Sequence, residues 1–144
     1  MKGYLQLKLD QTSSNKLKTK AEYPKVFCHH VTIIFGVSED DEHVQELLKI
    51  GEMIIKGKEV YKDSKCQALS VDILSDFVSL NKEQVDLLKK NGQKQNYHIT
   101  ISTQEGVFPV YSNDLLKNHD AETEPYPEIL RGTMKFIRFS KQEA

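Results

Sequence analysis

The sequence predicts an α+β fold: two related lobes of antiparallel sheet, with flanking helices, around a central groove. Segments with strand character are interleaved with helical segments of about ten residues, which favours a mixed fold with antiparallel sheets. Two strand segments also carry the same pattern, His30-Val31-Thr32-Ile33 and His98-Ile99-Thr100-Ile101. The two copies are separated by about half of the 144 residues, and no linker or low-complexity segment divides the chain. We therefore expect one domain over residues 1–144 with two pseudo-symmetric halves.

The first half begins with a strand over residues 3–10, in which Leu5, Leu7 and Leu9 alternate with Tyr4 and polar residues. Residues 11–25 are polar and rich in lysine, and they predict a solvated loop. A second strand covers residues 27–35 and ends before a glycine. Ser38, with Asp41 three residues later, is a capping signal for a helix that runs to about residue 50, where Gly51 ends it.

The second half begins with a hairpin, in which residues 53–61 and 66–74 are the strands and residues 62–64 the turn. Asn81 and Gln84 then cap a helix that is expected to end at Asn91-Gly92. A strand over residues 97–102 follows, and then a short helix over residues 113–118. Residues 120–128 form an acidic loop that contains prolines, and a last strand covers residues 130–139.

Strand alternation assigns the side chains of the two matched segments to faces. His30 shares a face with Thr32, and His98 shares one with Thr100, because residues two apart on a strand point the same way. The opposite, apolar faces are expected to carry His29, Val31, Ile33 and Phe35 on the first strand, and Tyr97, Ile99 and Ile101 on the second. Each strand would thus present an imidazole and a hydroxyl to the groove and bury hydrocarbon on its other side.

Charge and composition exclude several classes of partner. The net charge is −1 with 28% charged residues, so no global field favours long nucleic acid or a membrane surface. No apolar run approaches the roughly 18 residues that a membrane span needs. Two cysteines, Cys28 and Cys66, give no disulfide framework, and no secretory leader is evident. We expect a cytoplasmic protein, in the host-cell cytoplasm if it is viral.

Two histidines that face one groove can divide the work of proton transfer. One imidazole takes a proton from an attacking hydroxyl or water, and the other gives a proton to the leaving oxygen. Hydroxyls on the same strands can donate to the non-bridging oxygens of a phosphodiester, where charge builds in the transition state. The pattern therefore predicts an enzyme that cleaves phosphodiesters, with His30, Thr32, His98 and Thr100 as its catalytic residues and no cofactor.

A metal site is the alternative chemistry. The sequence has no His-Glu-x-x-His and no Cys-x-x-Cys, and no acidic cluster lies beside either matched segment. Alternation would nevertheless place Cys28 on the same face as His30, so a site made of Cys28, His30 and His98 stays open. We predict no metal ligands, because such a site would leave the two threonines without a role.

The paired His-x-Thr-apolar segments resemble the active-site motifs of the 2H phosphoesterase superfamily, whose four positions His30, Thr32, His98 and Thr100 match one for one. The resemblance implies metal-independent attack on a phosphodiester, often with participation of a ribose 2′-hydroxyl. The small size, the opening Gly-Tyr strand and the run Cys28-His29-His30-Val31-Thr32 look most like the phage anti-CBASS nucleases. Those enzymes degrade the cyclic oligonucleotide alarm signals of bacterial defence and so serve immune evasion.

The expected substrate is therefore a cyclic di- or trinucleotide or another short RNA-type phosphodiester. Three residues are candidates for binding it: Tyr4 as a base-stacking residue, Tyr126 on the loop between two prolines, and Lys20 in the basic segment, which in this interpretation is a flap that closes over phosphates. Two other functions stay open. One is an enzyme that opens 2′,3′-cyclic phosphates at RNA ends or cuts 2′-5′ oligoadenylate. The other is a nucleotide-binding module without turnover.

Overall fold

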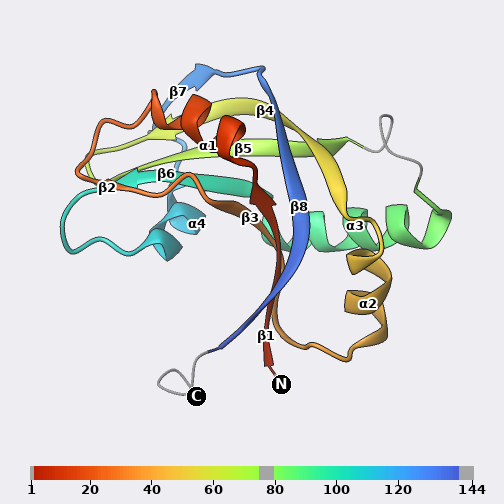
Figure 1. The fold of residues 1–144 in the computed structure, drawn as a ribbon. Helices are drawn as coiled ribbons and strands as arrows, with labels where there is room; N and C mark the ends of the chain where they lie inside the picture. Colours follow the sequence, from red (N-terminus) through yellow and green to blue (C-terminus); the bar gives the residue numbers. More distant parts are fainter. Residues whose placement is uncertain (1, 75–79, 140–144) are drawn as a thin grey trace.

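The computed structural model describes residues 2–74 and 80–139 and shows an α+β fold built on one eight-stranded antiparallel sheet (Figure 1). The strand order is β2-β6-β5-β4-β8-β1-β3, and β7 pairs with β4 beside this path. The predicted fold class is confirmed. The strands are β1 (Lys2–Leu9), β2 (Lys25–Val26), β3 (His30–Ser38), β4 (Glu52–Lys62), β5 (Cys66–Leu74), β6 (His98–Thr103), β7 (Glu122–Pro125) and β8 (Ile129–Arg138).

The helices connect these strands and cover parts of the sheet. They are α1 (Gln11–Lys18), α2 (Glu42–Leu48), α3 (Lys82–Gln95) and the short α4 (Ser112–Leu115), which follows the 3₁₀ turn η1 (Pro109–Tyr111). In Figure 1, α2 and α3 lie together on one side of the molecule and α1 lies apart from them. Helix α3 packs against β3, and its Leu87 and Leu88 join the main core.

The two ends of the strand path meet, and this brings the two histidine strands together. The backbone of residues 27 and 28 continues the pairing of β2 with β6: the N–H groups of Phe27 and Cys28 donate to the carbonyls of Ile101 and Thr100 at 2.8 and 2.9 Å. At the next residue the backbone pairs with β1 instead of β6: the carbonyl of His29 accepts from the N–H of Leu9 at 2.8 Å. Strand β3 therefore starts beside β6.

The core lies on the apolar faces that the alternation predicts. The side chains of Leu5, Leu7, Val31, Ile33, Ile99 and Ile101 are fully buried in one cluster. Burying a side chain of this size contributes about 1.5–3 kcal/mol relative to its exposed state. This burial fixes the register of the strands, because a slip by one residue would turn the whole apolar set to solvent.

Residues 11–18 form a helix, so the prediction of a loop was wrong for this part of the segment. The side chain of Asp10 caps the helix by accepting from the N–H of Ser13 at 2.7 Å. Leu17, the only large apolar residue among the eight, is fully buried in the core. The hydroxyl of Ser14 donates to the carbonyl of Cys28, and that of Ser13 accepts from the N–H of Arg131. Tertiary contacts thus hold a helix whose sequence is polar.

Other boundaries differ from the prediction in detail. Helix α2 is capped by Asp41 and not by Ser38. The predicted capping box of Asn81 and Gln84 is confirmed for α3, which continues past Gly92 and ends at Asn96 in the left-handed conformation, with φ of 49°. Gly92 lies inside the helix, at a point where a Cβ would come within 3.0 Å of the Tyr97 ring, so the missing side chain makes room for that ring. Strand β7 lies within the segment predicted as an acidic loop.

Candidate active site

His30 and Thr32 of β3 line the same groove as His98 and Thr100 of β6. The four residues that the sequence pattern selected are thus brought together, although they come from opposite halves of the chain. The groove has a cavity volume of about 540 Å³. Its remaining lining residues are mostly apolar or aromatic: Phe27, His29, Phe35, Pro109, Val110 and Asn113. A groove of this kind can hold a planar apolar group beside polar groups that orient it.

His98 is held by the end of α3. Its Nδ1 lies 2.8 Å from the carbonyl oxygen of Asn96, the residue whose left-handed conformation ends the helix. A carbonyl oxygen only accepts, so Nδ1 carries a hydrogen and donates it. In the neutral ring this leaves the lone pair on Nε2. Burial lowers the pKa of His98, and the hydrogen bond to Asn96 opposes this shift in part.

His30 is placed against an aromatic ring of the neighbouring strand. The centroids of the His30 and Tyr4 rings are 5.9 Å apart at an interplanar angle of 39°. The pKa of His30 is lowered to about 4, mainly by burial and further by the charges of His29 and His98. The imidazole is therefore neutral at neutral pH in the unliganded protein.

The two threonines differ in how their hydroxyls are held. The Thr100 oxygen lies 2.8 Å from the Ser112 hydroxyl and 3.4 Å from the carbonyl oxygen of Pro109. Ser112 is fully buried, and its hydroxyl also lies 3.4 Å from the Cys66 sulfur. Within residues 2–74 and 80–139, the Thr32 side chain makes no hydrogen bond. Ser112 was not predicted as part of the site, because no local sequence pattern connects it to Thr100.

Phe35 also faces the groove, so its assignment to the apolar side was wrong. In the pairing of β1 with β3, Gln6 is opposite Thr32, but its neighbour Leu5 is opposite Ile34. Ile33 is therefore an extra residue of β3 with no counterpart on β1. Such a bulge re-aims the residues that follow it. Phe35 is therefore opposite Tyr4 and on the groove face, with 63% of its surface exposed.

Tyr4 lies on the groove face as predicted, but it is half-buried and stands behind Phe35. The two rings stack with centroids 5.9 Å apart at 26°, and Phe139 contacts both of them. The groove-lining ring of this group is that of Phe35. Tyr4 thus supports both Phe35 and His30 from the adjacent strand.

His29 and Cys28 lie opposite to their predicted positions. His29 is exposed and lines the groove, and its ring meets that of Phe27 edge-on. Cys28 is fully buried, and burial raises the pKa of its thiol to about 12. The physical reason is the positive φ of 59° at Cys28, which interrupts the strand alternation where the chain crosses from β6 to β1. The alternative metal site of Cys28, His30 and His98 is consequently not formed.

The structure places Tyr126 and Lys20 away from the groove, which corrects both predictions. Tyr126 is 6% exposed and belongs to the main core, because its N–H donates to the carbonyl of Lys58 and anchors the loop against β4. The ammonium of Lys20 is 2.7 Å from Glu124 and lines another pocket, with Glu22, Lys62 and Glu122.

No group of three or more His, Cys, Asp or Glu side chains in the described part of the chain is arranged to hold a metal ion.

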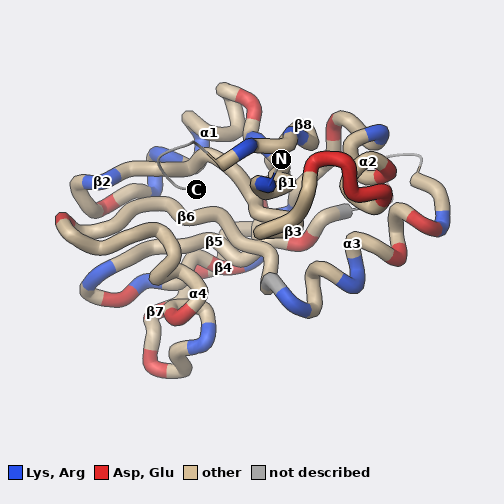
Figure 2. The backbone as a smooth tube through the Cα atoms, turned by 90° about the horizontal axis from the view of Figure 1, so that it is seen from below, with Lys and Arg blue, Asp and Glu red and all other residues tan. Residues whose placement is uncertain are grey.

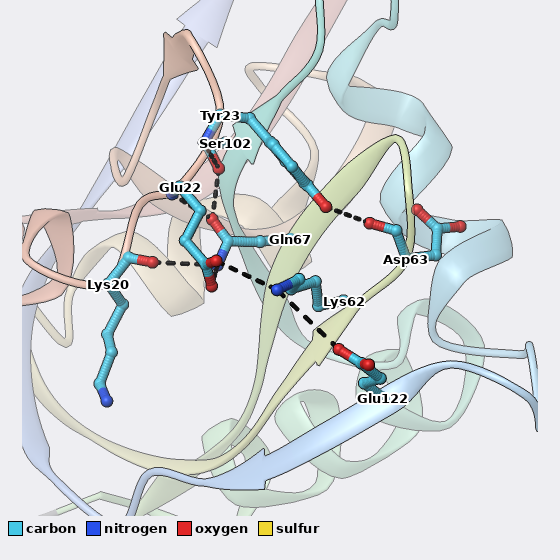
Figure 3. A network of polar contacts seen from close by, with 8 residues as sticks. All are labelled: Lys20, Glu22, Tyr23, Lys62, Asp63, Gln67, Ser102 and Glu122. Carbon is cyan, nitrogen blue, oxygen red and sulfur yellow. Dashed lines mark hydrogen bonds and ion pairs between the residues drawn. The ribbon is translucent and has the colours of Figure 1, made fainter.

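Lys20 belongs to a polar network that fastens the segment after α1 to the sheet (Figure 3). Gln67 of β5 is almost fully buried. Its amide donates to the carbonyl of Lys20 at 2.9 Å, and its oxygen accepts from the N–H of Glu22 at 2.8 Å. Ser102 of β6 donates to the same oxygen, and Lys62 pairs with Glu22 and Glu122. These contacts satisfy the polar groups internally, which is typical of a structural role.

Charged residues of both signs alternate along most of the backbone, with one acidic run ahead of and into α2 (Figure 2). Among the described residues no long basic run follows the backbone, which disfavours a long polyanion. Among the residues described, no helix is long and apolar enough to cross a membrane.

Comparisons with known proteins support the fold. No family model matches the chain, and a search of curated proteins finds no match. Among solved structures, the chain is similar to one described as the crystal structure of a fungal RNA kinase, with a TM-score of 0.54 and 16% identity. The match covers 96% of this chain and 44% of that one. The chain therefore has the fold of a region that makes up less than half of that protein.

Proposed function

We propose that the protein is a phosphodiesterase that cleaves short RNA-type substrates by acid-base catalysis between His30 and His98. The observation that carries the proposal is that two His-x-Thr strands from opposite halves of the chain line one groove. The resemblance of these motifs to the 2H phosphoesterase superfamily agrees with it. The structural neighbour described as an RNA kinase is consistent with a substrate of the RNA type.

His98 suits the role of general base. Its Nδ1–H is committed to the Asn96 carbonyl, so Nε2 is the nitrogen available to accept a proton from a ribose 2′-hydroxyl. The imidazolium that results keeps its hydrogen bond to Asn96, which stabilises the new charge. The 2′-oxygen then attacks phosphorus, the bond from phosphorus to the leaving 5′-oxygen breaks, and a 2′,3′-cyclic phosphate forms.

His30 suits the role of general acid in the same step. The unliganded ring is neutral, with a pKa of about 4. A bound phosphodiester places negative charge beside the ring and favours its protonated form. Protonated His30 can then give its proton to the leaving 5′-oxygen, which balances the proton that His98 has taken.

The threonine hydroxyls suit the non-bridging oxygens of the same phosphate. Thr32 donates freely, whereas Thr100 is oriented by Ser112 at 2.8 Å. Donors that are already in place where charge develops are worth about 2.7–4 kcal/mol each.

The groove favours a small substrate with bases. Its apolar walls, Phe35 on one strand and Pro109 and Val110 on the other side, suit the faces of nucleobases. We propose a cyclic di- or trinucleotide, as for the anti-CBASS nucleases, which would be opened to a linear product. The alternatives are 2′,3′-cyclic phosphate ends of RNA, 2′-5′ oligoadenylate, and binding without turnover.

One panel tests the function and ranks these substrates. The protein is incubated with EDTA and cyclic di- and trinucleotides, 2′-5′ oligoadenylate and cyclic-phosphate-ended RNA, and the products are resolved by chromatography. We expect cleavage of the cyclic oligonucleotides in EDTA, and the double variant His30→Ala/His98→Ala is the control. Cleavage that requires added zinc or manganese would contradict the metal-free mechanism. Binding without cleavage of any substrate would favour the binding module.

A further inference from the structure

The outer face of β1 and β8, next to the histidines, carries polar groups that the proposed reaction does not use. Residues directly opposite each other on antiparallel strands point to the same face. Lys8 is opposite His30, and Gln6 is opposite Thr32. On the next strand, Lys135 is opposite Gln6. The face that presents His30 and Thr32 therefore continues across β1 to Lys135.

The side chain of Gln6 makes no hydrogen bond within residues 2–74 and 80–139. By strand register it lies between Thr32 and Lys135, and the residue as a whole is only 6% exposed. Its amide atoms nevertheless reach solvent, because the Thr103 hydroxyl is the only fully buried side-chain polar atom without a partner in that part of the chain. The amide is therefore held in place by its packing and is open to a hydrogen bond from outside. A ligand that crosses this face would supply one.

Lys8 and Lys135 are exposed, and neither forms an ion pair within the described part of the chain. By contrast, Lys20 and Lys62 are paired with glutamates. Across the strands, Lys8 is opposite Thr133 of β8, and Thr133 is opposite Glu52 of β4. The acid in register with Lys8 thus lies two strands away from it. The two ammonium groups are thus available to an anion.

We propose that Gln6, Lys8 and Lys135 form a second subsite, which binds a phosphate adjacent to the scissile one and its ribose. Strands are about 4.8 Å apart, so this subsite begins one strand away from His30 and Thr32. The ligand class is an oligonucleotide with at least two phosphates. This inference rests on the proposed function for the identity of the scissile phosphate.

The test compares two ligands that differ by one phosphate. These are the dinucleoside monophosphate and the trinucleoside diphosphate of adenosine, both as ribose forms for turnover and as 2′-deoxy forms for binding. The variants are Lys8→Gln, Lys135→Gln and Gln6→Leu. Lys90→Gln, an exposed lysine on α3, is the matched control.

We expect each lysine variant to raise the Kd and KM of the two-phosphate ligand about tenfold and to change those of the one-phosphate ligand less than about twofold. The slope of log affinity against log salt should fall by about 0.7 for each lysine removed. Gln6→Leu should weaken binding of the larger ligand while the unliganded variant stays as stable as the wild type, because the Gln6 side chain makes no internal hydrogen bond that the variant could lose.

Equal effects on the two ligands, or effects no larger than those of Lys90→Gln, would overturn the subsite. So would wild-type protein that binds both ligands equally. If the wild type cleaves neither ligand but still prefers the two-phosphate one through these lysines, the catalytic proposal fails and the subsite stands.

Discussion

The Nδ1 atom of His98 lies 2.8 Å from the backbone carbonyl oxygen of Asn96, and this contact distinguishes the two histidines of the groove. The described part of the chain gives His30 no such hydrogen bond; its ring lies against that of Tyr4 instead. One imidazole therefore has a fixed tautomer with its acceptor nitrogen free, and the other has both nitrogens available. This asymmetry makes the assignment of base and acid testable.

A substrate with a good leaving group should separate the two roles. Nitrophenolate leaves without a proton, so a uridine 3′-(4-nitrophenyl phosphate) needs the base but not the acid. We expect His30→Ala to retain most of its activity on this ester, while His98→Ala loses on the order of 10²-fold or more. On a dinucleoside substrate both variants should lose that much. Greater retention by His98→Ala on the nitrophenyl ester would reverse the assignment.

Ser112 should act through Thr100. Thr32→Val and Thr100→Val should each lower kcat/KM about 10²-fold, because each removes one donor to the phosphate. Ser112→Ala leaves the Thr100 hydroxyl without its 2.8 Å partner, and we expect a loss of about tenfold in kcat.

A double-mutant cycle separates this role from a general effect on the fold. In the Thr100→Val background, Ser112→Ala should cause almost no further loss of activity, because its effect passes through that hydroxyl. Additive losses, or a drop in kcat that follows the free energy of unfolding, would contradict the positioning role.

The sequence was sufficient to predict the fold class, most of the core faces and the meeting of the four motif residues in one groove, because strand alternation is a local property that burial enforces. Two interruptions of this alternation were not predictable. The bulge in β3 turns Phe35 to the groove, and the positive φ of Cys28 turns His29 outward. Both depend on the pairing of β3 and the residues before it with other strands, and a local stretch of sequence does not specify that pairing.

Tertiary contacts also explain the other errors. The polar segment after β1 becomes α1 because Leu17 and two serines find partners in the core and in distant backbone. Tyr126 stands in an acidic segment with prolines, which predicts a loop, yet pairing of β7 with β4 carries it into the core. Ser112 belongs to no sequence motif, and its contact with Thr100 arises only from the approach of α4 to β6.

Stability should depend on pH through His30. Its folded pKa of about 4 is below the ordinary value of 6.5, so the unfolded chain binds more protons between these values. The contribution of neutral His30 is fully present above pH 6.5 and is lost as the pH falls toward 4. Urea unfolding from pH 7.5 to 4.5 should therefore show a smaller loss for His30→Gln than for wild type. His43→Gln, at an exposed residue of α2, should follow the wild-type curve; a His30→Gln curve parallel to it would contradict the prediction.

Phe35 should contribute to substrate binding. Phe35→Ala removes an exposed ring that lines the groove, and base stacking on an aromatic ring is worth about 1–3 kcal/mol. We expect KM for a dinucleotide to rise about tenfold or more with a smaller change in kcat. Phe108→Ala is the comparison, because this ring is also largely exposed, at 76% against 63% for Phe35, but does not line the groove. If both variants behaved alike, Phe35 would have no particular role in stacking.

The identity of the nucleophile, a ribose 2′-hydroxyl or water, can also be tested. If His98 Nε2 takes a proton from the ribose 2′-hydroxyl, replacing that hydroxyl by hydrogen removes the nucleophile but leaves the phosphate and its contacts with Thr32 and Thr100 unchanged. A cyclic di- or trinucleotide with one 2′-deoxyribose beside a 3′-5′ linkage should thus bind within about twofold of the parent and resist cleavage at that linkage, while its other linkages are cut. Product mapping by mass spectrometry, together with a competition assay for binding, measures both properties. Cleavage of the deoxy linkage at the parent rate would identify water as the nucleophile, with His98 activating it instead.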